Sequence, residues 1–136
     1  MRTIILIISL GLFFSCKKET PVEIWNISQV HYKGNDLLAS KKKSIVYKAI
    51  PLYLDYNSNW IIIDLDPKVK GKYDKYYEED GYYYMDINNF NDERFNGEYV
   101  ITIDTIRSSS TSSEIRMIME SNNVYLMGHK SIFKGI

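Results

Sequence analysis

The chain has 136 residues and carries 17 Lys and Arg against 17 Asp and Glu, so its formal charge is zero. Proteins that bind nucleic acid usually have a clear excess of basic residues, and this balance therefore predicts no nucleic-acid partner. The single cysteine, Cys16, excludes an internal disulfide framework and a cluster of thiolate metal ligands.

The N-terminal segment has the pattern of an export signal. Arg2 supplies a positive charge, and the 12 residues of segment 3–14 are almost all apolar. A helix that spans a bilayer needs about 20 residues, whereas the apolar part of a signal peptide has roughly 7–15. Cys16 follows at the border between this segment and the charged run 17–19. We therefore expect a signal peptide and not a membrane-spanning helix.

The residues around the cysteine resemble the bacterial lipobox. Ser15 and Cys16 match its last two positions, although Phe13 and Phe14 are bulkier than the residues that usually precede them. In that family a peptidase cuts before the cysteine, and the cysteine thiol carries a diacylglyceryl group. The alternative is an ordinary signal peptide in which the cysteine is incidental.

This resemblance implies how the chain is divided and where it is found. Residues 1–15 would be the signal peptide, Cys16 would carry the lipid, and residues 16–21 would tether a single β domain of residues 22–136. The start of the tether is similar to lipoproteins of the Bacteroidota. Lys17 in place of Asp implies the outer membrane of the cell envelope. The expected partner of the N-terminus is therefore a membrane, reached through the lipid.

The first half of the domain predicts strands separated by polar turns. Glu23–Tyr32 combines β-favouring residues with alternating polarity, and Lys33–Asp36 has the composition of a turn. Ser44–Tyr56 is a second strand-like segment, and Trp60–Leu65 is the most hydrophobic one after the signal.

The middle of the domain gives a weaker pattern. Tyr73, Tyr76 and Tyr77 have helical spacing and Gly81 suits a helix C-terminus, so this segment predicts one or two helical turns. Tyr82–Ile87 then predicts a strand, because it is rich in aromatic and apolar residues.

The C-terminal third gives the clearest pattern. Gly97–Asp104 and Glu114–Glu120 both alternate between apolar and polar residues, which is typical of half-buried strands. Asn122 and Asn123 suit a two-residue hairpin turn, because Asn tolerates positive φ. A hairpin with this turn would place three pairs opposite each other: Met119 and Leu126, Met117 and Gly128, and Arg116 and His129.

Strands of this length joined by short turns predict a mainly β fold, a small antiparallel barrel or sandwich with at most one short helix. Trp25 in the first strand, the turn with Gly34 and the terminal hairpins resemble bacterial lipocalin-like lipoproteins, although Ile24 stands where that family usually has glycine. The resemblance implies a barrel that holds a small apolar ligand. The cavity would be lined by residues such as Trp60, Ile62, Tyr99, Ile101 and Met117.

Aromatic residues give the candidate binding site, since rigid aromatic area with hydroxyl groups is enriched at interfaces and stacking sites. A glycan, a protein or a small apolar ligand could each use such a surface. The alternative is that alternate tyrosines pack on the core while the others cover the sheet. The candidate residues are Tyr73, Tyr76, Tyr77, Tyr82, Tyr83 and Tyr84, together with Trp60.

The sequence offers little for catalysis or metal binding. No nucleophile elbow, phosphate-binding glycine loop or zinc-protease motif is present. His31 and His129 are the only histidines, and neither has a recognisable catalytic partner in the sequence. Asp64, Asp66 and the acidic run 78–80 lack the spacing of a calcium loop. We therefore expect no catalytic residue, no metal site and no cofactor.

These observations lead to two hypotheses. The first is a non-enzymatic, membrane-anchored domain that binds a small apolar ligand. The second is a protein-interaction lipoprotein, such as an immunity or inhibitor protein that captures a partner protein in the cell envelope.

Overall fold

The computed structural model describes residues 22–39 and 50–135. The expected signal peptide, Cys16, the tether and the first part of the Ser44–Tyr56 segment lie outside the described residues. The elements in chain order are β1 (Glu23–Tyr32), β2 (Asn35–Asp36), β3 (Ile50–Asp55), β4 (Trp60–Ile63), β5 (Val69–Glu79), β6 (Tyr82–Ile87), the 3-10 turn η1 (Glu93–Phe95), β7 (Gly97–Ser108), β8 (Ser112–Glu120) and β9 (Val124–Phe133).

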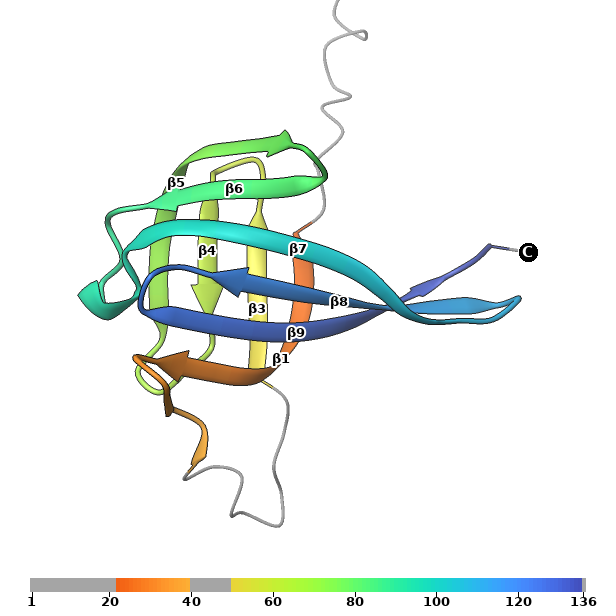
Figure 1. Cartoon of the computed structure of the whole chain (residues 1–136), viewed down its shortest axis with the longest axis horizontal. Coiled ribbons are helices and arrows are strands. Elements are labelled where there is room, and N and C mark those ends of the chain that lie inside the picture. The colour runs from red at the N-terminus through yellow and green to blue at the C-terminus, as the bar shows by residue number, and fades with distance from the viewer. Residues whose placement is uncertain (1–21, 40–49, 136) are drawn as a thin grey trace, which may run out of the picture.

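Eight strands of the described chain form a closed barrel in which neighbouring strands are antiparallel (Figure 1). Their order is β1-β3-β4-β5-β6-β7-β8-β9, and β9 pairs with β1 to close the ring, while the short β2 pairs with β1 alone. This up-and-down order confirms the predicted antiparallel barrel and decides against a sandwich.

The barrel interior is filled by side chains. Each strand directs alternate residues inward, and the buried residues of the described chain are all apolar or aromatic. An eight-stranded barrel has an interior just wide enough for side chains to fill. The largest fully buried side chains are Trp25, Tyr99, Phe95, Ile27, Leu38, Leu52, Ile61, Ile63, Met85, Ile87, Met117 and Met119.

The cavity expected from the sequence does not form as predicted. β4 buries Ile61 and Ile63, so Trp60 and Ile62 lie on the outer face of the same strand. Met117 does face inward, as predicted, but it is part of the packed core. The residues expected to surround one ligand therefore lie on both sides of the barrel wall.

The two ends of the barrel have different side chains. Leu38, Phe90 and Phe95 fill the end at which β6 leads into β7, and we call it the phenylalanine end. The rings of Phe90 and Phe95 meet edge to face with centroids 6.0 Å apart. Gly71 makes room for this packing, because a Cβ atom there would lie 2.7 Å from the Phe90 ring. The opposite end, which includes the β5–β6 turn, is the tyrosine end.

Three strands continue beyond the barrel as an arm (Figure 1). β6 last pairs with β7 at Ile101, and β1 last pairs with β9 at His129. Past these positions β7, β8 and β9 pair with one another alone as far as Ser108, Ser112 and Phe133. The arm leaves Phe133 with 81% of its surface exposed.

The predicted C-terminal hairpin is confirmed. β8 and β9 are antiparallel and join through the 121–123 turn. The three pairs inferred from the sequence are those observed: Met119 with Leu126, Met117 with Gly128, and Arg116 with His129.

The predicted helical turn around the first three tyrosines is wrong, because this segment is strand β5. The pairing of β5 with β6 shifts between Tyr73 and Lys75, where β5 has one extra residue. In a regular strand, residues three positions apart face opposite sides, but the extra residue of a bulge restores the same side. Tyr73 and Tyr76 therefore have helical spacing and still share the inner face of a strand.

Candidate functional site

The six clustered tyrosines lie on the β5–β6 hairpin, and the pleat divides them between the two faces of the barrel wall. Tyr77 is the register partner of Tyr84, and their rings stack on the outer face with centroids 5.1 Å apart and planes 16° apart. Tyr76 and Tyr83 stack on the inner face, with centroids 5.7 Å apart. The hairpin tyrosines are therefore divided between the two faces and do not form a single continuous patch. This arrangement is close to the alternative given by the sequence, in which alternate tyrosines pack on the core while the others cover the sheet.

The inner tyrosines form a cluster that closes the tyrosine end of the barrel. Tyr73 and Tyr76 have ring centroids 6.2 Å apart, and Tyr76 also contacts Tyr56 at 5.9 Å. Tyr56, which directly follows β3, was not among the predicted site residues. Tyr56 precedes the polar 57–59 turn, and nothing in the sequence predicted that its side chain would face the β5–β6 hairpin.

A partly buried ion pair between Lys130 and Glu23 completes this closure. The Tyr56 hydroxyl donates to Glu23 Oε2 at 2.9 Å, and Lys130 Nζ donates to Glu23 Oε1 at 2.6 Å. The same Lys130 Nζ lies 4.6 Å from the centroid of the Trp25 ring. Trp25 Nε1 is buried without a hydrogen-bond partner among the described residues. These contacts join β1, β3 and β9 at the end from which the arm projects.

Tyr56, Tyr73 and Tyr76 are unsuited to acid–base chemistry near neutral pH. Burial raises the pKa of Tyr56 far above its ordinary value, and the hydrogen bond to Glu23 raises it further. Burial also raises the pKa of Tyr73 and of Tyr76. Their hydroxyl groups therefore stay protonated, and the cluster acts as a structural closure of the barrel.

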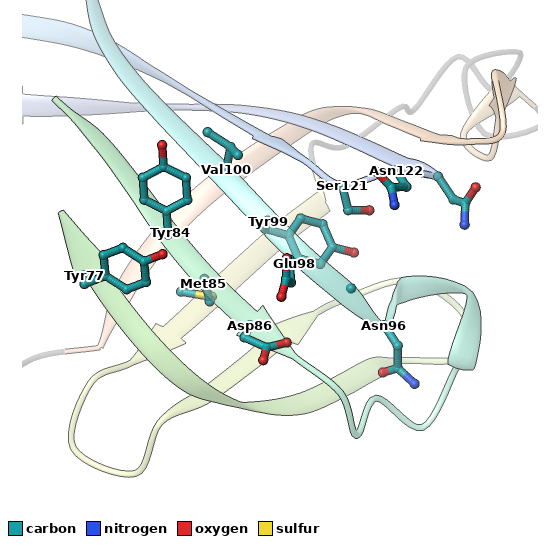
Figure 2. Close-up of a pocket in the computed structure, with 12 residues that line it drawn as sticks. Tyr77, Tyr84, Met85, Asp86, Asn96, Glu98, Tyr99, Val100, Ser121 and Asn122 are labelled. Carbon is teal, nitrogen blue, oxygen red and sulfur yellow. The ribbon is translucent and has the colours of Figure 1, made fainter. Parts of the chain in front are cut away.

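The outer tyrosine pair borders a groove of about 520 Å³ on the barrel wall (Figure 2). The groove runs over β6 and β7 and reaches the β8–β9 turn, and Tyr77 of the neighbouring β5 lies at one edge. Tyr84 has Tyr77 as its partner on one side and Val100 of β7 on the other, so these three side chains form an apolar strip. Half of the Tyr77 surface, 49%, is exposed.

Polar side chains continue the groove beyond this strip. Asp86 and Glu98 are register partners on β6 and β7, which sets their carboxylates side by side on the outer face. Asn96, Ser121 and Asn122 line the part nearest the phenylalanine end. The Asn96 Oδ1 atom accepts from the Phe90 N–H at 2.8 Å, which fixes this side chain in place.

Within the described chain, Asp86 and Glu98 are the only charged residues that line the groove. Asp86 has two register partners, Glu98 on β7 and Lys75 on β5, and a ligand with several hydrogen-bond donors can interact with the carboxylates of Asp86 and Glu98 together. The groove thus combines an aromatic strip, two carboxylates and neutral amide and hydroxyl groups.

Sequence reasoning found Tyr77 and Tyr84 but missed the polar part of this groove. Asp86 follows Tyr84 by two positions in the predicted Tyr82–Ile87 strand, so strand periodicity alone places both on one face. Glu98 could not be joined to them from the sequence, because its position depends on the pairing of β6 with β7.

Trp60 lies apart from the groove. It is on the outer face of β4, where Lys70 Nζ is 4.1 Å and Lys72 Nζ is 5.0 Å from its ring centroid. Both lysines belong to β5, and Lys72 is the register partner of Trp60. The structure therefore does not join Trp60 to the tyrosines with which the sequence analysis grouped it.

The histidines do not come together either. His31 contacts Tyr125 edge to face at 5.9 Å near the phenylalanine end, whereas His129 is opposite Arg116 on the base of the arm. Arg116 forms a two-point ion pair with Asp104, at 3.0 Å and 2.6 Å. Across residues 22–39 and 50–135, no three His, Cys, Asp or Glu residues gather closely enough to hold a metal ion.

Comparison with protein-family models gives no match, and comparisons with curated proteins and with solved structures give no significant match. No helix within the described ranges is both long and apolar enough to cross a membrane. Function is therefore inferred from the geometry of the barrel and its groove.

Proposed function

We propose that this protein is a lipid-anchored, non-enzymatic binding protein of the cell envelope, and that its ligand occupies the outer groove. The observation that carries this proposal is the groove itself, where a stacked tyrosine pair, exposed at Tyr77, lies beside a carboxylate pair. Binding sites of small molecules commonly have 300–1,000 Å³ and combine aromatic walls with a few polar groups.

The packed interior favours the outer groove over a lipocalin-like internal site. Trp25, Met85, Met117 and Met119 occupy the barrel axis with at most 1% of their surface exposed. A ligand inside the barrel would have to displace these side chains, and their loss from a close-packed core would be costly. The outer groove needs no such rearrangement.

The anchor would keep the barrel close to the membrane. Glu23, the first residue of β1, lies seven positions after Cys16. An extended chain spans at most about 3.6 Å per residue, so the start of β1 would lie within about 25 Å of the lipid. Because β1 begins at the tyrosine end, this end would face the membrane and the groove would remain on the side wall.

Replacing Cys16 by alanine is expected to abolish lipidation, because the thiol is the only group in the proposed lipobox that can carry the diacylglyceryl chain. Cells fed an alkyne-labelled fatty acid should label the wild-type protein, and the Cys16→Ala protein should carry no label. Ser15→Ala keeps a small residue before the cysteine and should remain labelled. A labelled Cys16→Ala protein would refute the anchor.

Replacing Tyr84 by alanine is expected to remove the ligand, because Tyr84 is the centre of the apolar strip. Native mass spectrometry of protein purified from its own cells should show an added mass on the wild type and none on the Tyr84→Ala variant. Tyr53→Ala is the matched control, since Tyr53 lies on the outer face of β3, away from the groove. An added mass that survives Tyr84→Ala, or a wild type without one, would count against the proposal.

The arm favours the protein-interaction alternative. Phe133, Ile132 and Ile106 are exposed there, and along the arm, past Ile101 and His129, the outer edges of β7 and β9 have no strand partner within the described residues. The same purification separates the two functions. A partner protein that is lost with Phe133→Ser and kept with Tyr84→Ala would assign binding to the arm.

A further inference from the structure

The polar groups of the groove define which ligands can bind there. The carboxylate oxygens of Asp86 and Glu98 accept hydrogen bonds, whereas the amides of Asn96 and Asn122 can donate as well as accept. An apolar ligand would displace water from both carboxylates without replacing the hydrogen bonds that the water makes. An anionic ligand would be repelled by the two carboxylates. The ligand must therefore bring several hydrogen-bond donors and carry no negative charge.

The apolar strip adds a second requirement. Tyr77, Tyr84 and Val100 follow one another across β5, β6 and β7, and the Asp86 and Glu98 pair lies in the next outward-facing row (Figure 2). A ligand that fits both rows has an apolar surface on one side and donors along its edge. A pyranose ring has this character, because its C–H groups form apolar patches and its hydroxyl groups project around the rim.

We propose that the groove binds a neutral, pyranose-containing glycan, an inference that rests on the proposed binding function of the groove. Sugar hydroxyl groups donate to the paired carboxylates of Asp86 and Glu98, and the ring C–H groups pack against the tyrosine strip. The Asn96 and Asn122 amides complete the polar contacts. A single ammonium group would interact with the two carboxylates but would leave the amides and the apolar strip unused.

The test uses the full-length lipidated protein in detergent, titrated by calorimetry with five probes: cellohexaose, maltohexaose, N-acetylchitohexaose, pentagalacturonic acid and spermidine. At least one neutral hexasaccharide is expected to bind, and the anionic probe is not. Asp86→Asn and Glu98→Gln should each weaken this binding by about tenfold, since each replaces a charged hydrogen-bond acceptor by a neutral one. Tyr53→Ala should leave the affinity unchanged.

Three outcomes would overturn the glycan assignment. One is the absence of binding by all three neutral probes, and the second is equal binding of pentagalacturonic acid. The third is spermidine binding that depends on Asp86 while the neutral sugars remain inert, which would reassign the groove to ammonium ligands.

Failure of this inference can be told apart from failure of the proposed function. If native mass spectrometry shows an added mass that Tyr84→Ala removes, and acid hydrolysis of that ligand releases no sugar, the groove binds but its ligand is no glycan. If Tyr84→Ala removes nothing, the groove is not the binding site at all.

Discussion

Replacing Gly71 by valine is expected to lower the free energy of unfolding by about 3 kcal/mol, at the upper end of the usual cost of overpacking a core. A Cβ atom at this position would lie 2.7 Å from Phe90 Cδ1 and 3.2 Å from Phe90 Cα. The Phe90 ring cannot move aside easily, since it is buried against Phe95. Its segment is also held to β5, where Asn91 N–H donates to Lys70 O at 3.0 Å and Lys70 N–H to Asn91 Oδ1 at 2.8 Å.

Urea unfolding followed by circular dichroism measures this loss of stability. Two further variants test whether the loss arises from the contact between residue 71 and Phe90. Gly135→Val is the matched control, because no atom lies within 4 Å of a Cβ atom there, and its unfolding should follow the wild type. Phe90→Ala alone should cost about 3–5 kcal/mol. In that background Gly71→Val should cost much less, because the ring it would strike is gone. Additive costs would show that Gly71 and Phe90 are not coupled.

The parts of the barrel that depend on local sequence pattern, such as the β8–β9 hairpin, could be predicted from the sequence. Alternation in Glu114–Glu120 and the two asparagines at 122–123 determine a hairpin with one register, because a slip by one residue would turn Met117 and Met119 outward. Barrel closure depends on the pairing of β1 with β9, whose residues are about 100 positions apart in the chain. No local signal distinguishes this pairing from the two-sheet alternative.

The tyrosine segment shows why part of the site could not be predicted. One extra residue between Tyr73 and Lys75 gives a strand the spacing of a helix. The division of the tyrosines into an inner closure and an outer strip follows from that bulge. The sequence supplied the aromatic half of the groove through Tyr77 and Tyr84. The carboxylate half could not be predicted, because it needs the register between β6 and β7.

Raising the pH above about 10 is expected to destabilise the protein by about 2–3 kcal/mol by pH 11, through tyrosines that are buried or partly buried. A tyrosine in the unfolded chain ionises with a pKa near 10. Burial raises the pKa of Tyr99 well above this value, and burial with the Glu23 hydrogen bond does the same for Tyr56. Burial also raises the pKa of Tyr73 and Tyr76.

The direction of this pH effect follows from the numbers of protons that the folded and the unfolded chain bind. Above pH 10 the unfolded chain loses phenolic protons that the folded protein keeps, so stability is full below this pH and falls as pH rises. Each tyrosine that stays fully protonated contributes a loss of about 1.4 kcal/mol per pH unit. Tyr99 comes close to this limit, whereas Tyr56 and Tyr76 contribute less because solvent reaches part of their rings and screens the interaction.

Urea unfolding at pH 8, 10, 10.5 and 11 measures the decline, and paired variants assign it. Lysines also lose protons in this range, so the comparison with Tyr→Phe variants is the decisive one. Tyr99→Phe and Tyr56→Phe each remove one hydroxyl hydrogen bond, which lowers stability at pH 8, but each should make the decline above pH 10 shallower. Met119→Leu changes the core without a titrating group and should keep the wild-type slope. An equal slope in wild type, Tyr56→Phe and Tyr99→Phe would show that these two tyrosines do not set the alkaline limit of the barrel.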